Sequence, residues 1–521
     1  MQYGQFTGDS DQPARAAHAR QTASLNSPGS DNSVLKSLKS AARFALAEGG
    51  SVKVRVLRSG MWVGLSEAVL AAVNLLRSVV LARLLTPEVF GLMALAGVAI
   101  RTIETFTRPG IAQALIARRG QFEEVSDTAF TMLVGRGVVL AIALAVAAPC
   151  VAAFFEAEEL KPLLQVLSLV LVIGSFVSIN TISRQRELEF RRLTYLSQAT
   201  TLAGTVVTIA VAYWLRSVWA LVIGQIATVS INVALSYWLV GGRPRFGFDR
   251  RVARGLLAYG KFITGSSIVL YIASEADSTA IGKLLGPAQL GYYAMAMSLA
   301  TMVTSNLSKA ASSVMMPAYS ELQSNPAALR NAYLRTLSLV MFIVMPATAG
   351  LVAVARPLVE LVLGEVWIEA VLPLQSLAIF GLVRSLAALA GYLFEGMGLP
   401  RIAFKLGLLR LAVLLPLLLP MIDMFGLAGA AAAVTAGIAS QWLSGLYYLH
   451  RYLAVGVLQL AIAMWRPLWT SAAMAFAVLG SMRILDASSI VRLSAVVVVG
   501  ITVFGLLNVR VIREMTKQGL R

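Results

Sequence analysis

The sequence predicts an all-α integral membrane protein with about 14 transmembrane helices, and three observations lead to this fold class. Of its 521 residues, 58% are hydrophobic and only 13% are charged, whereas soluble domains carry about 25% charged residues. The mean hydropathy is +0.75. Uncharged apolar stretches such as Gly137–Phe155 and Met424–Leu449 are long enough to cross a bilayer. They do not alternate apolar and polar residues as barrel strands do, so helices are expected.

Five segments follow from this pattern. A polar leader at 1–59 is expected to be a disordered cytoplasmic tail, with weak anchoring to anionic lipid headgroups as the alternative. Residues 60–242 and 256–452 each hold six predicted helices, joined by a basic linker at 243–255, and 453–521 holds two more helices and a basic tail. The predicted helices begin near residues 61, 89, 128, 162, 195, 218, 258, 290, 333, 371, 402, 427, 467 and 489.

Arginine gathers in the links that follow the fourth and sixth predicted helices. The link at 183–192 carries four arginines and the link at 241–255 carries five, while the link after the third helix is mostly acidic. Because lysine and arginine accumulate in cytoplasmic loops, both termini are expected in the cytoplasm. This distribution accounts for much of the net charge of +18, so nucleic acid is not expected as a partner.

The inventory of reactive side chains is small. The single cysteine, Cys150, excludes a disulfide framework, and the two histidines, His18 and His450, are isolated, so no His/Cys metal cluster can be assembled. The chain has no phosphate-binding loop and no nucleophile motif. No catalytic residue and no metal ligand is predicted, and the chain is not expected to be an enzyme.

An internal repeat joins the two six-helix segments. Residues 82–92 read ARLLTPEVFGL and residues 282–292 read GKLLGPAQLGY, which is one pattern at an offset of 200. Its proline and glycine are expected to end one helix and start the next at an elbow. The second half starts six predicted helices after the first, so both halves run in the same direction and the repeat is parallel, with an axis along the membrane normal. Parallel halves around a midplane cavity are a transporter architecture.

Charges within predicted helices mark the candidate binding residues, because a charge inside the membrane is costly and tends to face a cavity. In the first helix Glu67, Asn74 and Arg77 fall within a narrow arc, and in the second Arg101, Glu104 and Arg108 share a face. The seventh helix carries Glu275 and Asp277, which point in different directions. At the offset of 200, Asp277 corresponds to Arg77. The eight candidates are Glu67, Asn74, Arg77, Arg101, Glu104, Arg108, Glu275 and Asp277.

Two interpretations of these charges stay open. In one, Arg101, Glu104 and Arg108 neutralise each other in a row and Arg77 extends to the membrane interface. In the other, the arginines form a cationic cavity wall that binds an anionic headgroup, since the guanidinium fork donates bidentately to phosphate.

Three segments resemble the polysaccharide transporter family of oligosaccharide-lipid flippases, within the multidrug/oligosaccharidyl-lipid/polysaccharide exporter superfamily. They are LRSVVLARLLTPEVFGLMALA at 76–96, DSTAIGKLLGPAQLGYYAMA at 277–296 and RQRELEFRRL at 184–193. The resemblance covers about residues 60–450. It implies two six-helix lobes in a V shape around a central cavity. In the related lipid II flippases an arginine occupies the place of Arg77, and two additional helices, similar to the last two here, form a lipid-tail groove.

The resemblance also implies a function. The expected activity is movement of an undecaprenyl-diphosphate-linked oligosaccharide across the bacterial inner membrane by alternating access, for exopolysaccharide or lipopolysaccharide assembly. The expected partners are this lipid, the membrane, a polysaccharide polymerase and a chain-length regulator. No cofactor is expected, and coupling to H⁺ or Na⁺ stays open. The alternatives are a drug or cation antiporter of the same superfamily and, less favoured because every predicted outside loop is short, a membrane polymerase or ligase.

Overall fold

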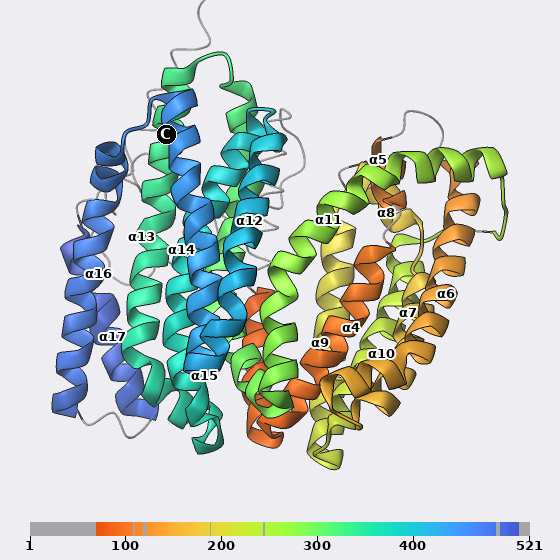
Figure 1. Cartoon of the computed structure of the whole chain (residues 1–521), viewed down its shortest axis with the longest axis horizontal. Coiled ribbons are helices and arrows are strands. Elements are labelled where there is room, and N and C mark those ends of the chain that lie inside the picture. The colour runs from red at the N-terminus through yellow and green to blue at the C-terminus, as the bar shows by residue number, and fades with distance from the viewer. Residues whose placement is uncertain are drawn as a thin grey trace, which may run out of the picture. The chain divides into compact units, whose positions relative to one another are not determined.

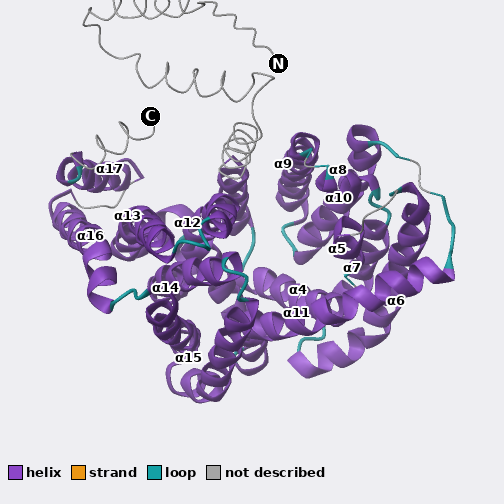
Figure 2. Ribbon diagram, turned by 90° about the horizontal axis from the view of Figure 1, so that it is seen from above, coloured by secondary structure: helices purple, strands orange, loops and turns teal. Residues whose placement is uncertain are grey.

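The structure is a computed structural model, and it describes residues 69–107, 110–117, 122–187, 189–242, 245–485 and 490–509. All of these belong to one compact unit, Trp62–Arg521. Glu67, Arg108, the leader at 1–59 and the end of the C-terminal tail lie outside the described residues. The described part contains helices and turns and no strand (Figure 2).

A helix at 69–84 comes first among the described residues. The elements of the first half that follow it are α4 (Pro87–Phe106), α5 (Ile111–Ala117), α6 (Glu123–Phe155), α7 (Leu160–Ser175), α8 (Asn180–Arg186), α9 (Phe190–Leu215), α10 (Val218–Leu235) and η1 (Ser236–Val240). The second half contains α11 (Arg250–Leu284), α12 (Gly286–Glu321), α13 (Pro326–Leu358), η2 (Val359–Leu363), η3 (Glu365–Ala370), α14 (Val371–Gly396) and α15 (Pro400–Leu453), followed by α16 (Val457–Leu485) and α17 (Ile490–Leu507). Figure 1 shows α4 to α10 gathered on one side and α12 to α17 on the other, with α11 between them.

Eight helices in the described part are long and apolar enough to cross a membrane, and the pair α7 and α8, bent by 58°, would make a ninth. Helices α11 and α12 lie where two further spans are predicted, but their polar residues lower their hydropathy below that of the other spans. The 54-residue α15 covers two predicted spans, with non-helical backbone at Gly426 between them. The chain is therefore a multi-pass membrane protein, while the count of 14 spans stays a prediction.

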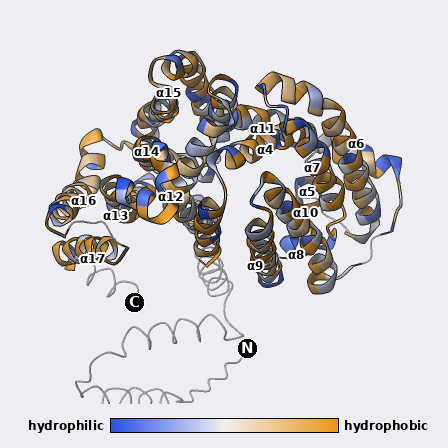
Figure 3. Ribbon diagram, turned by 90° about the horizontal axis from the view of Figure 1, so that it is seen from below, coloured by the Kyte–Doolittle hydropathy of each residue, from blue (hydrophilic) through white to orange (hydrophobic). Residues whose placement is uncertain are grey.

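The helices bury a leucine- and alanine-rich core and expose large apolar side chains outward. Leu95, Leu144 and Leu374 belong to one cluster that extends through both halves. Trp214 and Trp238 are largely exposed, and Figure 3 shows hydrophobic residues along much of the length of the helices. Exposed apolar area on this scale is typical of a surface that faces lipid.

The two predicted elbows are confirmed, and they cross each other. Each proline lies in the first turn of its helix, Pro87 in α4 and Pro287 in α12. A Cβ atom on Gly91 would lie 1.7 Å from the carbonyl oxygen of Pro287, and one on Gly291 would lie 1.8 Å from that of Pro87. The glycine of each repeat contacts the proline carbonyl of the other, and such a reciprocal contact is expected when two copies are related by two-fold symmetry. Glycine is required at both positions because the backbones touch there.

Side-chain caps start two of the long helices. The carboxylate of Asp249 accepts hydrogen bonds from the backbone N–H groups of Arg251 and Val252 at the start of α11. The Asn325 side chain accepts from the Ala328 N–H at the start of α13. Each cap satisfies donors that the first helical turn leaves free.

Candidate functional site

A polar cavity of about 440 Å³ lies between helix 69–84, α9 and α12. Seven of its lining residues carry a hydroxyl or amide group: Asn74, Ser78, Ser197, Thr201, Ser298, Thr301 and Ser305. The other lining residues are Leu70, Ala71, Leu75, Leu299 and Met302. Helices 69–84 and α9 belong to the first half of the chain and α12 to the second, so both repeats contribute to this cavity.

Of the polar stripe predicted for the first helix, Asn74 lines this cavity. Asn74 and Ser78, one turn apart, both line it, as the helical period requires. Arg77 lies between them in the sequence and is half-buried. Among the described residues no carboxylate forms an ion pair with Arg77. Glu67, the third member of the stripe, lies outside the described residues.

A second arginine reaches the cavity from behind its wall, and it was missed by the sequence analysis. Nη2 of Arg384, on α14, donates a hydrogen bond of 2.7 Å to Oγ of Ser305, which lines the cavity. The signal in the sequence was a single arginine in the apolar run 371–394, since an isolated charge in a span usually faces a cavity or a partner.

Arg101 pairs with the second half of the chain. Its Nε and Nη2 atoms donate to the two carboxylate oxygens of Glu275 on α11, at 3.0 and 2.8 Å. The Tyr271 hydroxyl, also on α11, lies 2.5 Å from the Thr102 hydroxyl and donates to the Val98 carbonyl. These contacts join α4 and α11 across the boundary between the halves.

This pairing corrects one part of the predicted self-neutralising row, because Arg101 binds Glu275 and not Glu104. The carboxylate that Arg101 binds comes from α11, because α11 packs along the same face of α4. Glu104, one turn away, is exposed, and Arg108 lies outside the described residues. Of the predicted candidates, the structure therefore brings together Arg101 and Glu275. Asn74 lines the separate polar cavity, and Arg77 is not among the residues that line it.

Asp277 is buried rather than set on a wet surface. Only 4% of it is exposed, and its carboxylate accepts hydrogen bonds from the Tyr293 hydroxyl at 2.6 Å and from the Ser278 N–H at 2.8 Å. Glu275 and Asp277 do point in different directions, as predicted, toward α4 and α12 respectively. Arg410 of α15 donates to the Ala273 carbonyl, one turn before Asp277. Polar contacts in this region of α11 therefore connect it to α12 and α15 within the second half.

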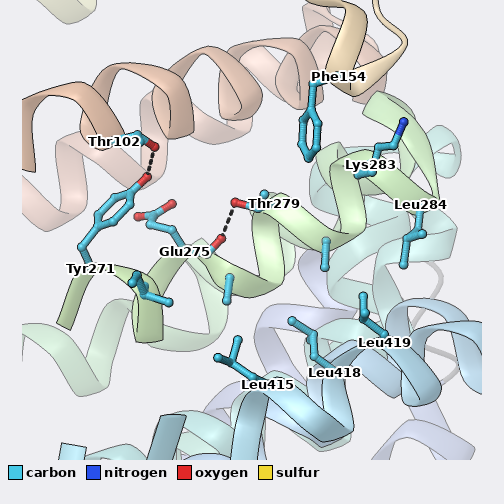
Figure 4. Close-up of a pocket in the computed structure, with 13 residues that line it drawn as sticks. Thr102, Phe154, Tyr271, Glu275, Thr279, Lys283, Leu284, Leu415, Leu418 and Leu419 are labelled. Atoms are coloured by element: carbon cyan, nitrogen blue, oxygen red, sulfur yellow. Dashed lines mark hydrogen bonds between the residues drawn. The ribbon is translucent and has the colours of Figure 1, made fainter. Parts of the chain in front are cut away.

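A further cavity, of about 530 Å³, lies along α11 (Figure 4). Thr102, Tyr271, Glu275, Thr279 and Lys283 are its polar residues. Its apolar residues are Phe154, Ile272, Ala276, Ala280, Leu284, Leu415, Leu418 and Leu419. Across the described residues, no group of three or more His, Cys, Asp or Glu side chains is placed to hold a metal ion.

The arrangement of helices defines a class of membrane protein. The fold matches the lipid II flippase MurJ in an inward closed conformation, with a TM-score of 0.70 and 13% sequence identity, over 87% of this chain and 99% of that one. It also matches an inward-facing multidrug transporter of the MATE family, with a TM-score of 0.57 and 16% identity, over 80% and 97% of the two chains. The protein thus has the fold that these transporters share.

The sequence places the chain more narrowly. The polysaccharide biosynthesis protein family matches residues 80–372, more than half of the chain, and the chain belongs to this family. The lipopolysaccharide biosynthesis protein WzxC of Escherichia coli is 26% identical over 432 residues, which cover 81% of this chain and 86% of that protein. The teichuronic acid biosynthesis protein TuaB of Bacillus subtilis is 24% identical over 357 residues, 68% and 74% of the two chains.

Proposed function

We propose that this protein is a flippase that moves undecaprenyl-diphosphate-linked oligosaccharide repeat units across the bacterial inner membrane, for exopolysaccharide or lipopolysaccharide assembly. The observation that carries the proposal is the hydroxyl-lined cavity between helices of both halves, with Arg77 on the helix that contributes Asn74 and Ser78, and with Arg384 hydrogen-bonded to Ser305. Membership of the polysaccharide biosynthesis protein family supports it, as do relatives named for lipopolysaccharide, teichuronic acid and succinoglycan biosynthesis.

The chemistry of the cavity suits the two polar parts of such a lipid. Serine, threonine and asparagine side chains both donate and accept hydrogen bonds, which matches the hydroxyl groups of a sugar. Arginine binds phosphate oxygens through paired donors, so Arg77 is assigned to the diphosphate. The cavity volume of about 440 Å³ lies within the usual range of ligand sites.

The transport cycle is proposed to be alternating access, with the two six-helix lobes rocking around a central V-shaped cavity. The arginine-rich links at 183–192 and 241–255 then face the cytoplasm, as do residues 1 and 521. Single cysteines at Ser183 and Gly247, placed in a Cys150→Ala background, should resist a membrane-impermeant thiol reagent in intact cells. Ready labelling from outside would reverse the orientation and the direction of transport.

A deletion experiment tests the function itself. Cells that lack the gene should lose surface polysaccharide and accumulate lipid-linked repeat units on the cytoplasmic side, and the intact gene should reverse both effects. Unchanged polysaccharide together with new sensitivity to cationic drugs would favour the antiporter alternative. Imposing H⁺ and Na⁺ gradients separately on membrane vesicles prepared from cells that carry the gene would identify the coupling ion. Copurification would test the proposed polymerase and chain-length regulator partners.

A further inference from the structure

Two basic side chains flank the crossing of the elbows, one in each repeat. Arg83, in the first repeat, donates from Nε to the Val362 carbonyl at 2.9 Å and from Nη2 to the Leu361 carbonyl, at the end of η2 in the second half. Lys283, at the same position of the second repeat, places Nζ 2.6 Å from Oε1 of Glu156, which follows α6 in the first half. Each repeat therefore has a polar contact that links its own elbow to the other half of the chain. These two contacts, of Arg83 and of Lys283, are the two fastenings.

The two fastenings differ in what surrounds them, since the Arg83 side chain is itself exposed and the difference comes from its neighbours. Beside Arg83, the indole N–H of Trp367 donates to the Ala82 carbonyl at 2.9 Å, and only 1% of Trp367 is exposed. Its ring packs edge-on against Phe90 and Tyr292. Breaking this cluster would leave buried polar groups without partners and expose apolar area, and both effects are costly.

The Lys283–Glu156 pair has a single short contact and is open to solvent. The two side chains are 34% and 78% exposed, and the ammonium also lies 5.6 Å from the centre of the Phe154 ring. Exposed ion pairs contribute little stability because water and salt screen them. Of the two fastenings, the one at Lys283 therefore costs much less to open.

Lys283 is one of the residues that line the cavity along α11 (Figure 4). A neighbouring cavity of about 360 Å³ shares Thr102, Phe154 and Thr279 with it, so the two cavities adjoin each other, and this space lies beside the contact between α4 and α11. Leu415 and Leu419 of α15 are exposed at its apolar wall. Loosening the Lys283–Glu156 pair would widen this space.

We propose that the boundary between the halves opens at the Lys283–Glu156 pair while the cluster of Arg83 and Trp367 holds as the pivot, and that this opening is the exit for the lipid-linked substrate. Once released from Glu156, the Lys283 ammonium takes a substrate phosphate and the leucines of α15 contact the lipid chain. The assignment of the exit rests on the proposed function, whereas the unequal opening does not.

Thiol labelling tests the unequal opening without any substrate. A cysteine at Thr279, in the full chain with Cys150→Ala, would be treated with a maleimide in permeabilised membrane vesicles. Lys283→Ala and Glu156→Ala should each raise the labelling rate about two- to fivefold, the range that loss of an exposed ion pair permits. The charge-exchanged double variant Lys283→Glu/Glu156→Lys should restore the slow rate.

Variants at the other fastening supply the comparison. Arg83→Lys, which keeps the cation, and Arg83→Ala should both leave the labelling rate at Thr279 unchanged in protein that purifies as a single species. An unchanged rate in Lys283→Ala, or a rate in either Arg83 variant as high as in Lys283→Ala, would overturn the proposal.

Cross-linking tests the exit. Cysteines that replace Glu156 and Leu284, an exposed neighbour of Lys283, leave the Lys283 ammonium in place. In the Cys150→Ala background, joining them by a short reducible bismaleimide should stop polysaccharide export, and reduction should restore it. Continued export by fully cross-linked protein would overturn the exit. If the labelling results hold but deletion of the gene leaves polysaccharide and its intermediates unchanged, the proposed function fails and the unequal opening stands.

Discussion

Pro87 and Gly91 in the first repeat have the same identities and the same reciprocal contacts as Pro287 and Gly291 in the second. At other equivalent positions the repeats differ. Arg77 is half-buried beside the polar cavity, whereas Asp277 is buried against Tyr293. Backbone contact leaves no room for a side chain at the crossing, so those residues are constrained in both copies. Charged side chains at equivalent positions have different neighbours in each half, so the residue types at these positions differ between the repeats.

The largest expected effect breaks the part that the repeats share. Gly91→Ala and Gly291→Ala each place a methyl group onto a backbone carbonyl, so each should destabilise the protein by about 1–3 kcal/mol and lower its amount in the membrane. Thermal unfolding in detergent measures this effect. Gly480→Ala is the matched control, since nothing lies within 4 Å of its new methyl group, and it should keep or slightly raise stability. Equal stability of Gly91→Ala and Gly480→Ala would contradict the crossing.

The second prediction concerns a position where the repeats differ. Arg77→Ala should abolish polysaccharide export while the protein still accumulates, because a hydrogen bond to a charged group contributes about 1.5–3 kcal/mol, which is tenfold or more in affinity. Arg77→Lys should be impaired but partly active, since lysine keeps the charge and loses the fork. Export is measured as surface polysaccharide per amount of flippase. Export by Arg77→Ala at the parent's rate would instead support an arginine that extends to the interface.

The third prediction measures the pairing of Arg101 with Glu275. A double-mutant cycle of Arg101→Ala and Glu275→Ala should give a coupling of about 0.5–1 kcal/mol, near the upper end for exposed pairs, because the contact is bidentate but Arg101 is 49% exposed. The exposed pair Arg356–Glu360, four residues apart where α13 continues into η2, should give less. The readout is again thermal unfolding in detergent. Zero coupling would mean that the two halves do not interact at this pair.

The smallest expected effect is the response of the Lys283–Glu156 pair to acid. The hydrogen bond from Lys283, reinforced by its charge, holds the pKa of Glu156 below its ordinary value of 4.5. A carboxyl with a lowered pKa keeps its contact above the ordinary value and loses it as the pH falls through the lowered one. Labelling of a Thr279→Cys variant with a pyridyl disulfide should therefore rise only below about pH 4.5 and stay flat from pH 6 to 8. The same titration in Lys283→Ala should show no such rise.

Residue patterns determined several features of this protein. Composition and apolar runs predict a helical membrane protein, and the repeated LL-x-P-x-x-x-G pattern predicts both elbows, since proline and glycine act on the backbone wherever they stand. The periodicity of the first helix predicted a polar face that includes Asn74, and Asn74 lines the polar cavity. These predictions hold because each depends on residues that are close in the sequence.

Only the tertiary structure decided which charges meet. The sequence placed Arg101 with Glu104 on one helix face, but α11 packs against that face and supplies Glu275 from 174 positions away. Arg384 contacts the polar cavity through its hydrogen bond to Ser305. Asp277 does not line a cavity wall as predicted, because Tyr293 of α12 covers it. A charge inside a bundle is stabilised by the nearest complementary group in space, and helix packing determines which group that is.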